Sequence, residues 1–433
     1  MRTSIIKHID NPVQFKRQLV TWAQQFREVI FLDSNDYPQQ YSSYDCIFAA
    51  DAFTSVKTDY HNAFEDLKQY QQTAKDWLFG YLSYDLKNDV EVLHSNNFDG
   101  LDFPDLFFFQ PKKIVTLKGS QLEIQYLTMC DDEVESDYQE ILKFQSPIFA
   151  TTVLSRLPSE EVQQRISKEN YLKKVSRILE HIHRGDIYEA NFCMEFLLEN
   201  ANINPLEKFL KLNKISKSPL AVFFKNNTHF LLSASPERYL KKEGELVISQ
   251  PIKGTAKRFL DAVEDERSKS ELASDPKERT ENIMVSDLVR NDLSRTAQKG
   301  SVKVEELCGI YSFEQVHQMI STITSKLDHQ YTVADVIKTT FPMGSMTGTP
   351  KVSVLKIIEE LEETKRGLYS GAVGYFTPNS DFDFNVVIRS ILYNQEKKYA
   401  SFSVGSAITS KSIPKMEYEE CLLKAKAMRE VLG

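Results

Sequence analysis

The chain has 433 residues, of which 41% are hydrophobic, so it is long enough to bury a large core. Its net charge is −8 and the charges are spread along the sequence, which excludes the basic stripe that a nucleic-acid backbone or an anionic membrane requires. No run approaches the roughly 18 apolar residues of a membrane span, and the first residues contain no signal-peptide core. The five cysteines are far apart and odd in number, so a reduced, cytoplasmic protein without a disulfide framework is expected.

The first part of the chain, residues 1–155, is predicted to contain short strands that are integrated with the core. Apolar or alternating runs at residues 28–34, 44–50 and 77–86 are separated by polar loops such as HSNNFDGLDFPD. The polar segment 155–171 is the candidate connection to the second part of the chain.

Three helices are predicted in the second part. Ser167 can cap the first, apolar residues then recur at helical spacing, and Gly185 can end it. Asp275 followed by Pro276 indicates the start of a second long helix, because aspartate suits the cap and proline the first helical position. A closing helix is expected from about Lys415.

Strand-like runs lie between these helices and are grouped together. They are IYEANFCMEFLL, LAVFFK, HFLLSA, ELVISQP, SGAVGYF, FNVVIRSILY and YASFSV. Strand clusters and helix clusters do not alternate as in βαβ units. This grouping favours an α+β fold with two packed, mainly antiparallel sheets flanked by helices.

Two Glu-x-x-Glu pairs lie on the predicted helices, Glu278 with Glu281 and Glu417 with Glu420. Residues three apart share a helix face, so each pair projects two like charges that repel unless a cation lies between them. Magnesium is a suitable cation because it is hard and prefers oxygen ligands. A solvated helix face is the simpler explanation of either pair taken alone.

Lys253 and Glu237 are candidate catalytic residues. QPIKGT predicts a strained loop above the strand ELVISQ, where the Lys253 ammonium would be partly desolvated and lose its proton more easily, as a nucleophile requires. Glu237 follows a proline turn in SASPERY, and a carboxyl group in a partly apolar pocket can hold its proton and act as a general acid. An ordinary turn lysine is the alternative for Lys253.

Seven motifs in a fixed order resemble a known family: SPERY, PIKGT, DPKERTENIMVSDLVRNDL, FPMGSMTGTPK, RGLYSGAVGYF, VVIRS and PKMEYEECLLKAKA. Together they resemble the chorismate-utilising enzymes, which include the large subunits of anthranilate and aminodeoxychorismate synthases and the isochorismate and salicylate synthases. The resemblance implies an anthranilate synthase component I-like fold, with a chorismate-binding catalytic region at residues 165–433. It is weaker in the first third, although FLDSNDYPQQYSSYD resembles the start of aminodeoxychorismate synthases.

Two positions distinguish the reactions within this family. Aminodeoxychorismate synthases resemble PIKGT, whereas anthranilate synthases have alanine where Lys253 stands here. The water-adding isochorismate and salicylate synthases carry a base lysine after a GxYxK-like motif, and the resemblance of GDIYEAN to this motif implies that Ala190 stands at that position. The resemblance therefore implies amination of chorismate at ring carbon 4, on the route to 4-aminobenzoate and folate.

The resemblance also implies a role for each candidate residue. Lys253 attacks carbon 2 while Glu237 protonates the departing hydroxyl group. Magnesium binds the ring carboxylate and would also help to lower the pKa of the lysine. The implied metal residues are Glu281 and Glu420, supported by Glu278 and Glu417. The implied substrate-binding residues are Arg389 and Tyr369 at the enolpyruvyl carboxylate, His317 near the ring, and Thr347, Gly405 and Lys424. A structural salt bridge is the alternative for Arg389, and a hydrogen-bonded core histidine is the alternative for His317.

Two motifs depart from the family pattern. The glycine-rich turn, commonly GAGI or GGGI, is GSAI at residues 405–408, and alanine at position 407 leaves less room for the substrate against the backbone. The usual HLVS is HQMIS. These changes bear on individual substrate contacts and leave the implied reaction class unchanged.

None of the cysteines lies in the GxCxG-like nucleophile motif of a glutamine amidotransferase, so ammonia is expected from a separate amidotransferase subunit. Anthranilate synthase component I is the alternative enzyme, and a catalytically silent, tryptophan-binding regulatory relative is the alternative of another class. An effector pocket like that of some relatives is the remaining prediction. Its residues would be Ser34, Tyr41, Ser42, Ser43 and Tyr44.

Overall fold

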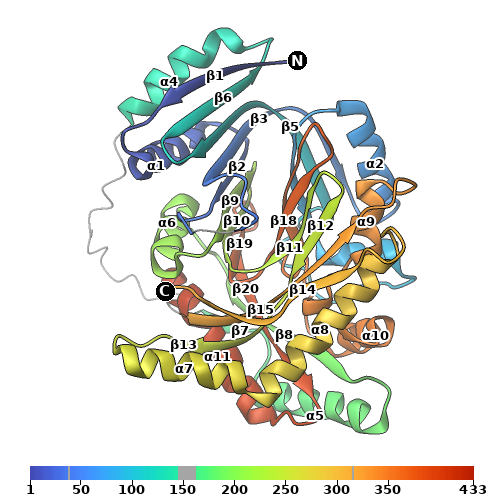
Figure 1. The fold of residues 1–433 in the computed structure, drawn as a ribbon. Helices are drawn as coiled ribbons and strands as arrows, with labels where there is room; N and C mark the ends of the chain where they lie inside the picture. The colour runs from blue at the N-terminus through green and yellow to red at the C-terminus, as the bar shows by residue number, and fades with distance from the viewer. Residues whose placement is uncertain (38–39, 145–161, 315) are drawn as a thin grey trace.

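The computed structural model describes residues 1–37, 40–144, 162–314 and 316–433 (Figure 1). Its named strands form one continuous network in which every pairing is antiparallel. The predicted connection begins outside the described residues, at 155–161, and its described end leads into a helix capped by Ser167.

Two long strands bend this network into two packed layers. β3 (Cys46–Thr58) and β5 (Leu106–Lys118) run through both layers, and the register of their pairing shifts between Ala52 and Thr54. A shift of this kind bends a strand. Between the layers lies an apolar core in which the rings of Tyr81 and Phe224, one from each layer, lie 5.3 Å apart edge to face.

The first layer contains β1 (Arg2–His8), β6 (Gln121–Leu127), β2 (Glu28–Asp33), β9 (Leu220–Asn226), β10 (His229–Ser235), β19 (Ser390–Asn394), β20 (Tyr399–Thr409), β8 (Glu189–Leu198), β7 (Gln163–Gln164) and β16 (Gly348–Thr349). The second contains β4 (Leu78–Leu82), β17 (Ala372–Phe376), β18 (Phe382–Val386), β11 (Arg238–Glu243), β12 (Leu246–Gln250), β15 (Val316–Lys326), β13 (Ile252–Lys257) and β14 (Lys303–Ser312). Strands from the first third of the chain pair with later ones in both layers, as β2 does with β9 and β4 with β17.

Helices cover the outer faces of both layers. The first layer is covered by α1 (Pro12–Trp22), α4 (Val134–Lys143), α5 (Lys168–Arg184), α6 (Pro205–Ser216), α10 (Lys351–Leu361) and α11 (Pro414–Leu432). The second is covered by α2 (Ala63–Ala74), α3 (Lys87–Val90), α8 (Pro276–Ser294) and α9 (Val333–Thr340). Short 3-10 turns are η1 (Ala23–Gln25), η2 (Tyr84–Leu86), η3 (Asp131–Glu133) and η4 (Gly344–Met346).

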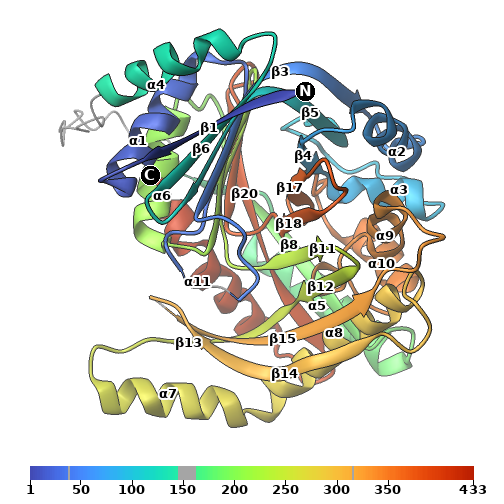
Figure 2. The same ribbon diagram turned by 45° about the horizontal axis from the view of Figure 1, so that its top comes forward.

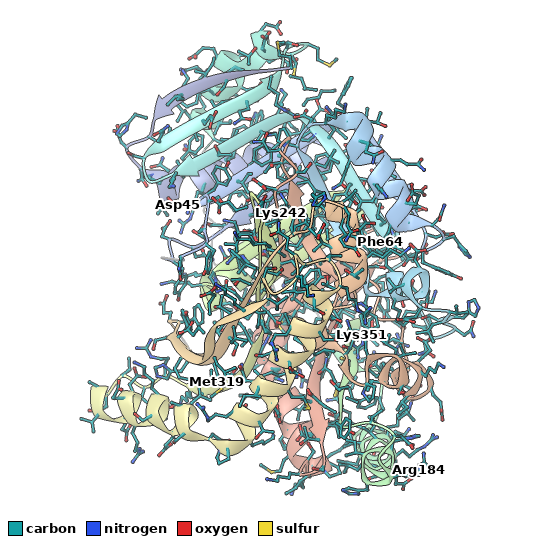
Figure 3. All side chains as sticks on the ribbon, turned by 45° about the vertical axis from the view of Figure 1, so that its right-hand side comes forward. Asp45, Phe64, Arg184, Lys242, Met319 and Lys351 are labelled. Atoms are coloured by element: carbon teal, nitrogen blue, oxygen red, sulfur yellow. The ribbon has the colours of Figure 1, made fainter. Side chains whose placement is uncertain are left out.

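α7 (Ala262–Ser274) lies along the strands β13, β15 and β14, at one side of the molecule (Figure 2). Met319 of β15 is fully buried on the face that α7 and α8 cover (Figure 3), where it packs with Leu272 and Cys308. This small cluster joins α7 to the part of the second layer that carries Lys253.

The predicted helix boundaries are confirmed. Ser167 accepts a hydrogen bond at the start of α5, and Gly185 ends that helix in the left-handed conformation. Asp275 caps α8, which begins at Pro276, and the closing helix α11 begins at Pro414, one residue before the expected start.

Two predicted elements were wrong in detail. Residues 384–393 do not form one strand, because β18 belongs to the second layer and β19 to the first, and the chain crosses between them at residues 387–389. Arg389 has a φ of 52° at this crossing. Lys253 does not lie in a loop: after Pro251 the chain continues as β13, so β12 and β13 both pair with β15.

Among the helices of the described residues, none combines the length and apolar character that crossing a bilayer needs. All five cysteines are free thiols and all are buried.

Candidate active site

Lys253 is held on a distorted strand. The register of β13 against β15 shifts between Ile252 and Thr255, and Gly254 has a φ of 93°, a conformation that other residues rarely adopt. The Lys253 side chain is only 11% exposed, and its Nζ donates a hydrogen bond of 2.8 Å to Oε1 of Glu189 on β8. The distortion of β13 therefore directs a buried ammonium group towards the opposite strand.

Burial and neighbouring charges act in opposite directions on Lys253. Burial lowers the pKa of the ammonium group, but the carboxylates of Glu189, Glu281 and Glu237 raise it, and the net shift is upward. The expectation that the surroundings lower this pKa is therefore wrong for the protein groups around Lys253, which together raise it. The reason is that the lysine lies among carboxylates rather than among apolar side chains.

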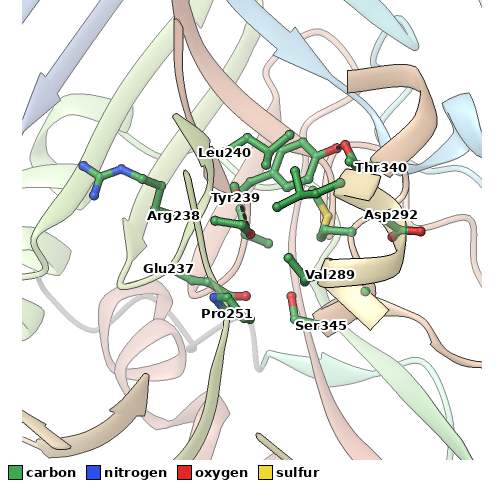
Figure 4. A pocket seen from close by; sticks show the side chains of 14 residues that line it. Glu237, Arg238, Tyr239, Leu240, Pro251, Val289, Asp292, Thr340 and Ser345 are labelled. Atoms are coloured by element: carbon green, nitrogen blue, oxygen red, sulfur yellow. Dashed lines mark hydrogen bonds between the residues drawn. The ribbon is translucent and has the colours of Figure 1, made fainter. Parts of the chain in front are cut away.

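Glu237 lies in the turn between β10 and β11 and is 2% exposed. Burial raises the pKa of its carboxyl group to about 7, although Ser345, the Lys253 charge and the backbone N–H of Ile252 oppose the rise. Glu237 and Ser345 line a small cavity between β11, β12 and α8, which Figure 4 shows. Its volume of about 20 Å³ can hold a water molecule. A carboxyl group in this environment can hold its proton near neutral pH.

The two carboxylate pairs face each other from α8 and α11. Glu281 is 7% exposed and Glu417 is 3% exposed. Within the described residues, Oε1 of Glu281 and Oε2 of Glu417 are buried and have no hydrogen-bond partner. Lys277 lies between the helices, with its Nζ 3.8 Å from one oxygen of each carboxylate. Burial raises the pKa of Glu281 to about 7 and also raises the pKa of Glu278.

This arrangement tests whether the residues fit a magnesium ion. In the part of the chain that the structure describes, no three acidic, histidine or cysteine side chains converge on a common point. The donor atoms nevertheless fit the ion, because the buried carboxylate oxygens on two facing helices have no hydrogen-bond partner among the described residues, and oxygen is the ligand that magnesium prefers. Lys277 is the chain's own cation at this position.

Arg389 and Lys424 form a second cationic group beside these carboxylates. Arg389 Nη1 donates a hydrogen bond of 3.1 Å to the carbonyl of Lys424, and no carboxylate of the described residues lies within 4 Å of the guanidinium. Burial lowers its pKa, although Tyr369 and Glu420 oppose this. Lys424 donates to Glu420 at 2.7 Å and to the carbonyl of Gly405 at 2.9 Å. A structural salt bridge therefore does not account for Arg389, whose charge is available to an anion.

Tyr369, Thr347 and Gly405 lie in the packed interior near β8. Tyr369 is 5% exposed and accepts a long contact of 3.9 Å from the Cys193 thiol. Thr347 is 1% exposed and its hydroxyl bonds to carbonyls of its own turn. A side chain at position 405 would meet Cys193 Sγ at 2.7 Å, so only glycine fits there.

The His317 ring is hydrogen-bonded to residues other than the predicted substrate contacts. It is 1% exposed, with Nδ1 2.8 Å from the Ser312 hydroxyl and Nε2 3.1 Å from Asp265 on α7. Both ring nitrogens thus have partners within the protein. This geometry agrees with the alternative of a hydrogen-bonded core histidine rather than with a ring contact.

The predicted effector residues lie between the two layers, at a cavity of about 50 Å³. Those that line it are Ser34, Ser42, Ser43 and Tyr44. The Ser34 hydroxyl is buried and has no hydrogen-bond partner among the described residues. Tyr41 does not line the cavity, and its carbonyl accepts a hydrogen bond of 2.6 Å from Lys241. A cavity of this volume has room for only a few water molecules and is too small for a tryptophan side chain.

Sequence reasoning missed Glu189 and chose its neighbour instead. Side chains alternate along β8, so Ala190 points into the outer core and Glu189 faces Lys253. Ala190 therefore does not occupy the site at all, which corrects the position inferred for a base on this strand. The sequence signal that could have identified Glu189 is a glutamate at the start of an apolar strand. All ten positions of this strand are buried, and a buried carboxylate needs a partner.

Comparison with known proteins places this site in context. Residues 27–430 match the family described as chorismate binding enzyme. Aminodeoxychorismate synthase component 1 of Bacillus subtilis is 30% identical over 387 residues, which are 88% of this chain and 80% of that protein. Anthranilate synthase component 1 of Thermus thermophilus is 32% identical over 355 residues, which are 81% of this chain and 76% of that protein.

A solved structure shows the same fold. The crystal structure of anthranilate synthase component I from Streptococcus pneumoniae has a TM-score of 0.76 and 23% identity, and the match covers 91% of this chain and 93% of that one. The predicted α+β, anthranilate synthase component I-like fold is therefore confirmed.

Proposed function

The chain belongs to the family of chorismate binding enzymes, and we propose that it aminates chorismate at ring carbon 4 to give 4-amino-4-deoxychorismate. The observation that carries this proposal is the buried Lys253 beside Glu237, a carboxyl group that can hold its proton. In the family resemblance a lysine at this position marks aminodeoxychorismate synthases. The relative from Bacillus subtilis that bears this name supports the assignment.

The first half of the reaction uses Lys253 and Glu237. The neutral amine of Lys253 attacks carbon 2 of chorismate, and the electron pair that shifts through the ring breaks the bond between carbon 4 and its hydroxyl group. Glu237 donates its proton to this oxygen, which leaves as water. The products are a lysine adduct that carries a positive charge on nitrogen and an ionised Glu237.

The second half reverses these roles. Ammonia adds at carbon 4, and the bond between carbon 2 and the lysine nitrogen breaks, with its electron pair returning to the nitrogen. The new ammonium group at carbon 4 gives a proton to Glu237, which restores the acid. Covalent catalysis thus divides one difficult displacement into two easier ones, with chorismate and ammonia converted into product and water.

The anionic substrate needs cations on the opposite side of the site. Glu281 and Glu420, with Glu278 and Glu417 in support, would hold a magnesium ion, whose charge would bind the ring carboxylate. Arg389, which has no carboxylate partner within 4 Å among the described residues, is available to bind the enolpyruvyl carboxylate, with Tyr369 beside it. Lys424, which donates to Glu420 and to the Gly405 carbonyl, adds a second positive charge beside Arg389. Thr347 is the remaining proposed substrate contact.

The ammonia is proposed to come from a separate glutamine amidotransferase subunit, because the five cysteines lie outside any amidotransferase nucleophile motif. The product would serve 4-aminobenzoate and folate synthesis in the cytoplasm, a reducing compartment that suits five free thiols. Glutamine alone should therefore be a poor nitrogen donor for the purified chain.

Anthranilate synthase component I is the competing function, since a relative with that name is equally similar. The product of the purified chain with chorismate, ammonia and magnesium separates the two. We expect chromatography to show 4-amino-4-deoxychorismate, which an added lyase converts into 4-aminobenzoate. Anthranilate, isochorismate or salicylate as the main product would refute the proposal.

A further inference from the structure

The proposed reaction leaves one proton unassigned. Lys253 must be a neutral amine to attack carbon 2, whereas the surrounding carboxylates favour its charged form. A group within reach of Nζ therefore has to accept a proton at the moment of attack. The search for this group rests on the proposed covalent role of Lys253.

We propose that Glu189 is the general base that takes this proton from Lys253 and returns it when the lysine is expelled. Oε1 of Glu189 lies 2.8 Å from Nζ, which is the distance of direct proton transfer. Glu237 and Glu281 also raise the pKa of Lys253, but neither is suited to accept its proton. Glu237 must itself be protonated for the leaving hydroxyl, and Glu281 forms no ion pair with Lys253 within 4 Å in the described residues.

Glu189 is placed by rigid structure. It is 4% exposed and lies at the start of β8, where it pairs with Thr349 of β16 on one side and Thr409 of β20 on the other. A side chain at Gly348 would collide with the Glu189 carbonyl, so the two backbones pack closely there. A base held in this way stays aligned with Nζ, as efficient proton transfer requires.

The proton that Lys253 loses returns to it within one catalytic cycle, because Glu189 keeps it in between. In the first half of the reaction the ammonium proton of Lys253 moves to the Glu189 carboxylate, and the freed electron pair forms the bond to carbon 2. In the second half Lys253 leaves as a neutral amine and takes the proton back from Glu189. The pair is thereby reset in each cycle without exchange with solvent, which suits two groups that are both buried.

The test measures the adduct on the peptide that contains Lys253. Purified protein with magnesium and chorismate, but without ammonia, is quenched at successive times and analysed by mass spectrometry. Glu189→Gln keeps the shape and a hydrogen-bond acceptor but cannot accept a proton, so adduct formation should be at least about 100-fold slower than in the wild type. Glu195→Gln is the matched control: Glu195 is equally buried on β8 but bonds to Tyr399 and Arg165 instead.

If Glu189 only supported the structure, the ratio of the wild-type rate to the Glu189→Gln rate of adduct formation would not depend on pH. If Glu189 is the base, the ratio of the wild-type rate to the Glu189→Gln rate should fall as the pH rises, because solvent hydroxide can then remove the lysine proton in the variant. The loss of the Glu237 proton above about pH 7 slows both proteins alike and cancels in this ratio. The remaining charged groups that act on Lys253 are Glu237, Glu281 and Glu420, and all three are ionised well above pH 7. Glu189→Asp, which keeps the carboxylate one methylene farther away, should slow the adduct and serves if Glu189→Gln does not fold by circular dichroism.

Each outcome separates this inference from the proposed function. No adduct in the wild type would refute the covalent mechanism itself. An adduct that forms in the wild type and equally fast in Glu189→Gln would show that Glu189 is only a hydrogen-bond acceptor. Faster formation in Glu189→Gln would show that Glu189 merely holds Lys253 in its charged form. Either of these two results, or an unchanged rate in Glu189→Asp, would overturn the inference.

Discussion

The two sides of the candidate site differ in how their charges are satisfied. On the lysine side the Lys253 ammonium meets the Glu189 carboxylate at 2.8 Å, and Glu237 accepts hydrogen bonds from Ser345 and Ile252. On the carboxylate side two buried oxygens, one from Glu281 and one from Glu417, have no partner among the described residues. A buried charge is tolerated only when something compensates it.

This difference indicates that the buried charges on the two sides are compensated in different ways. On the lysine side each charged group has a partner within the chain, Lys253 with Glu189 and Glu237 with Ser345 and Ile252. On the carboxylate side, Lys277 at 3.8 Å is too distant to form hydrogen bonds, and the proposed magnesium ion would supply the missing compensation. The following predictions test this contrast.

Removal of metal should have the largest effect, because it leaves the carboxylate side negative against an anionic substrate. Chelation with EDTA, or Glu420→Gln, should reduce turnover below detection while circular dichroism remains unchanged. Added magnesium should restore the chelated protein but not the variant. Full activity in EDTA would show that the carboxylate side needs no added cation.

Lys253→Ala should lower amination at carbon 4 by on the order of 10³-fold or more, because it removes the nucleophile. Chorismate should still bind, as measured by calorimetry, and a trace of amination at carbon 2 is expected because the pocket then resembles that of anthranilate synthases. Lys257→Ala, on the same strand but exposed, is the control. Near-normal activity of Lys253→Ala would mean that ammonia attacks the ring directly.

The ionisation of Glu237 should limit kcat/KM at high pH. Because burial raises the pKa of its carboxyl group to about 7, it is protonated below that pH and loses its proton as the pH rises. With the ammonia concentration held constant, kcat/KM should therefore fall about tenfold per unit above pH 7. Glu237→Gln should lower kcat by roughly 10²- to 10⁴-fold and abolish this limb. A profile that stays flat through this range would exclude Glu237 as the acid.

Glu281→Gln should stabilise the metal-free protein by about 1 kcal/mol above pH 7, because it replaces a buried carboxylate, whose Oε1 has no hydrogen-bond partner among the described residues, with a neutral amide. Urea denaturation in EDTA measures this change, with the exposed Glu266→Gln as control. In magnesium the variant should lose the stabilisation that the metal gives the wild type. A destabilised metal-free variant would mean that the charge of Glu281 is already compensated.

Lys277→Met should have the smallest effect, a loss of less than about 1 kcal/mol in EDTA, since the ammonium is 40% exposed and distant from both carboxylates. Without this competing cation, magnesium should bind more tightly and raise the melting temperature more than in the wild type. Lys269→Met on α7 is the control. An unchanged magnesium effect would show that Lys277 does not share the position of the metal.

Local signals in the sequence predicted much of this site. Capping at Ser167 and Asp275 depends on adjacent residues, so the starts of α5 and α8 were correct. Each Glu-x-x-Glu pair was placed on one helix face because residues three apart share a face whatever the tertiary structure. The seven motifs indicated the family, which the match over residues 27–430 confirms.

Long-range pairing decided the rest. The run at residues 384–393 looks like one strand because local β propensity is continuous, but its halves pair with partners in different layers. The same cause explains Lys253, whose upward pKa shift comes from carboxylates distant in the sequence, and Glu189, whose partner lies 64 residues away. The sequence by itself determined the three helices α5, α8 and α11, the family and the chemical types present at the site. Only the tertiary structure decided which charges meet, because electrostatic interactions depend on distances in space, which sequence spacing sets only within a single element.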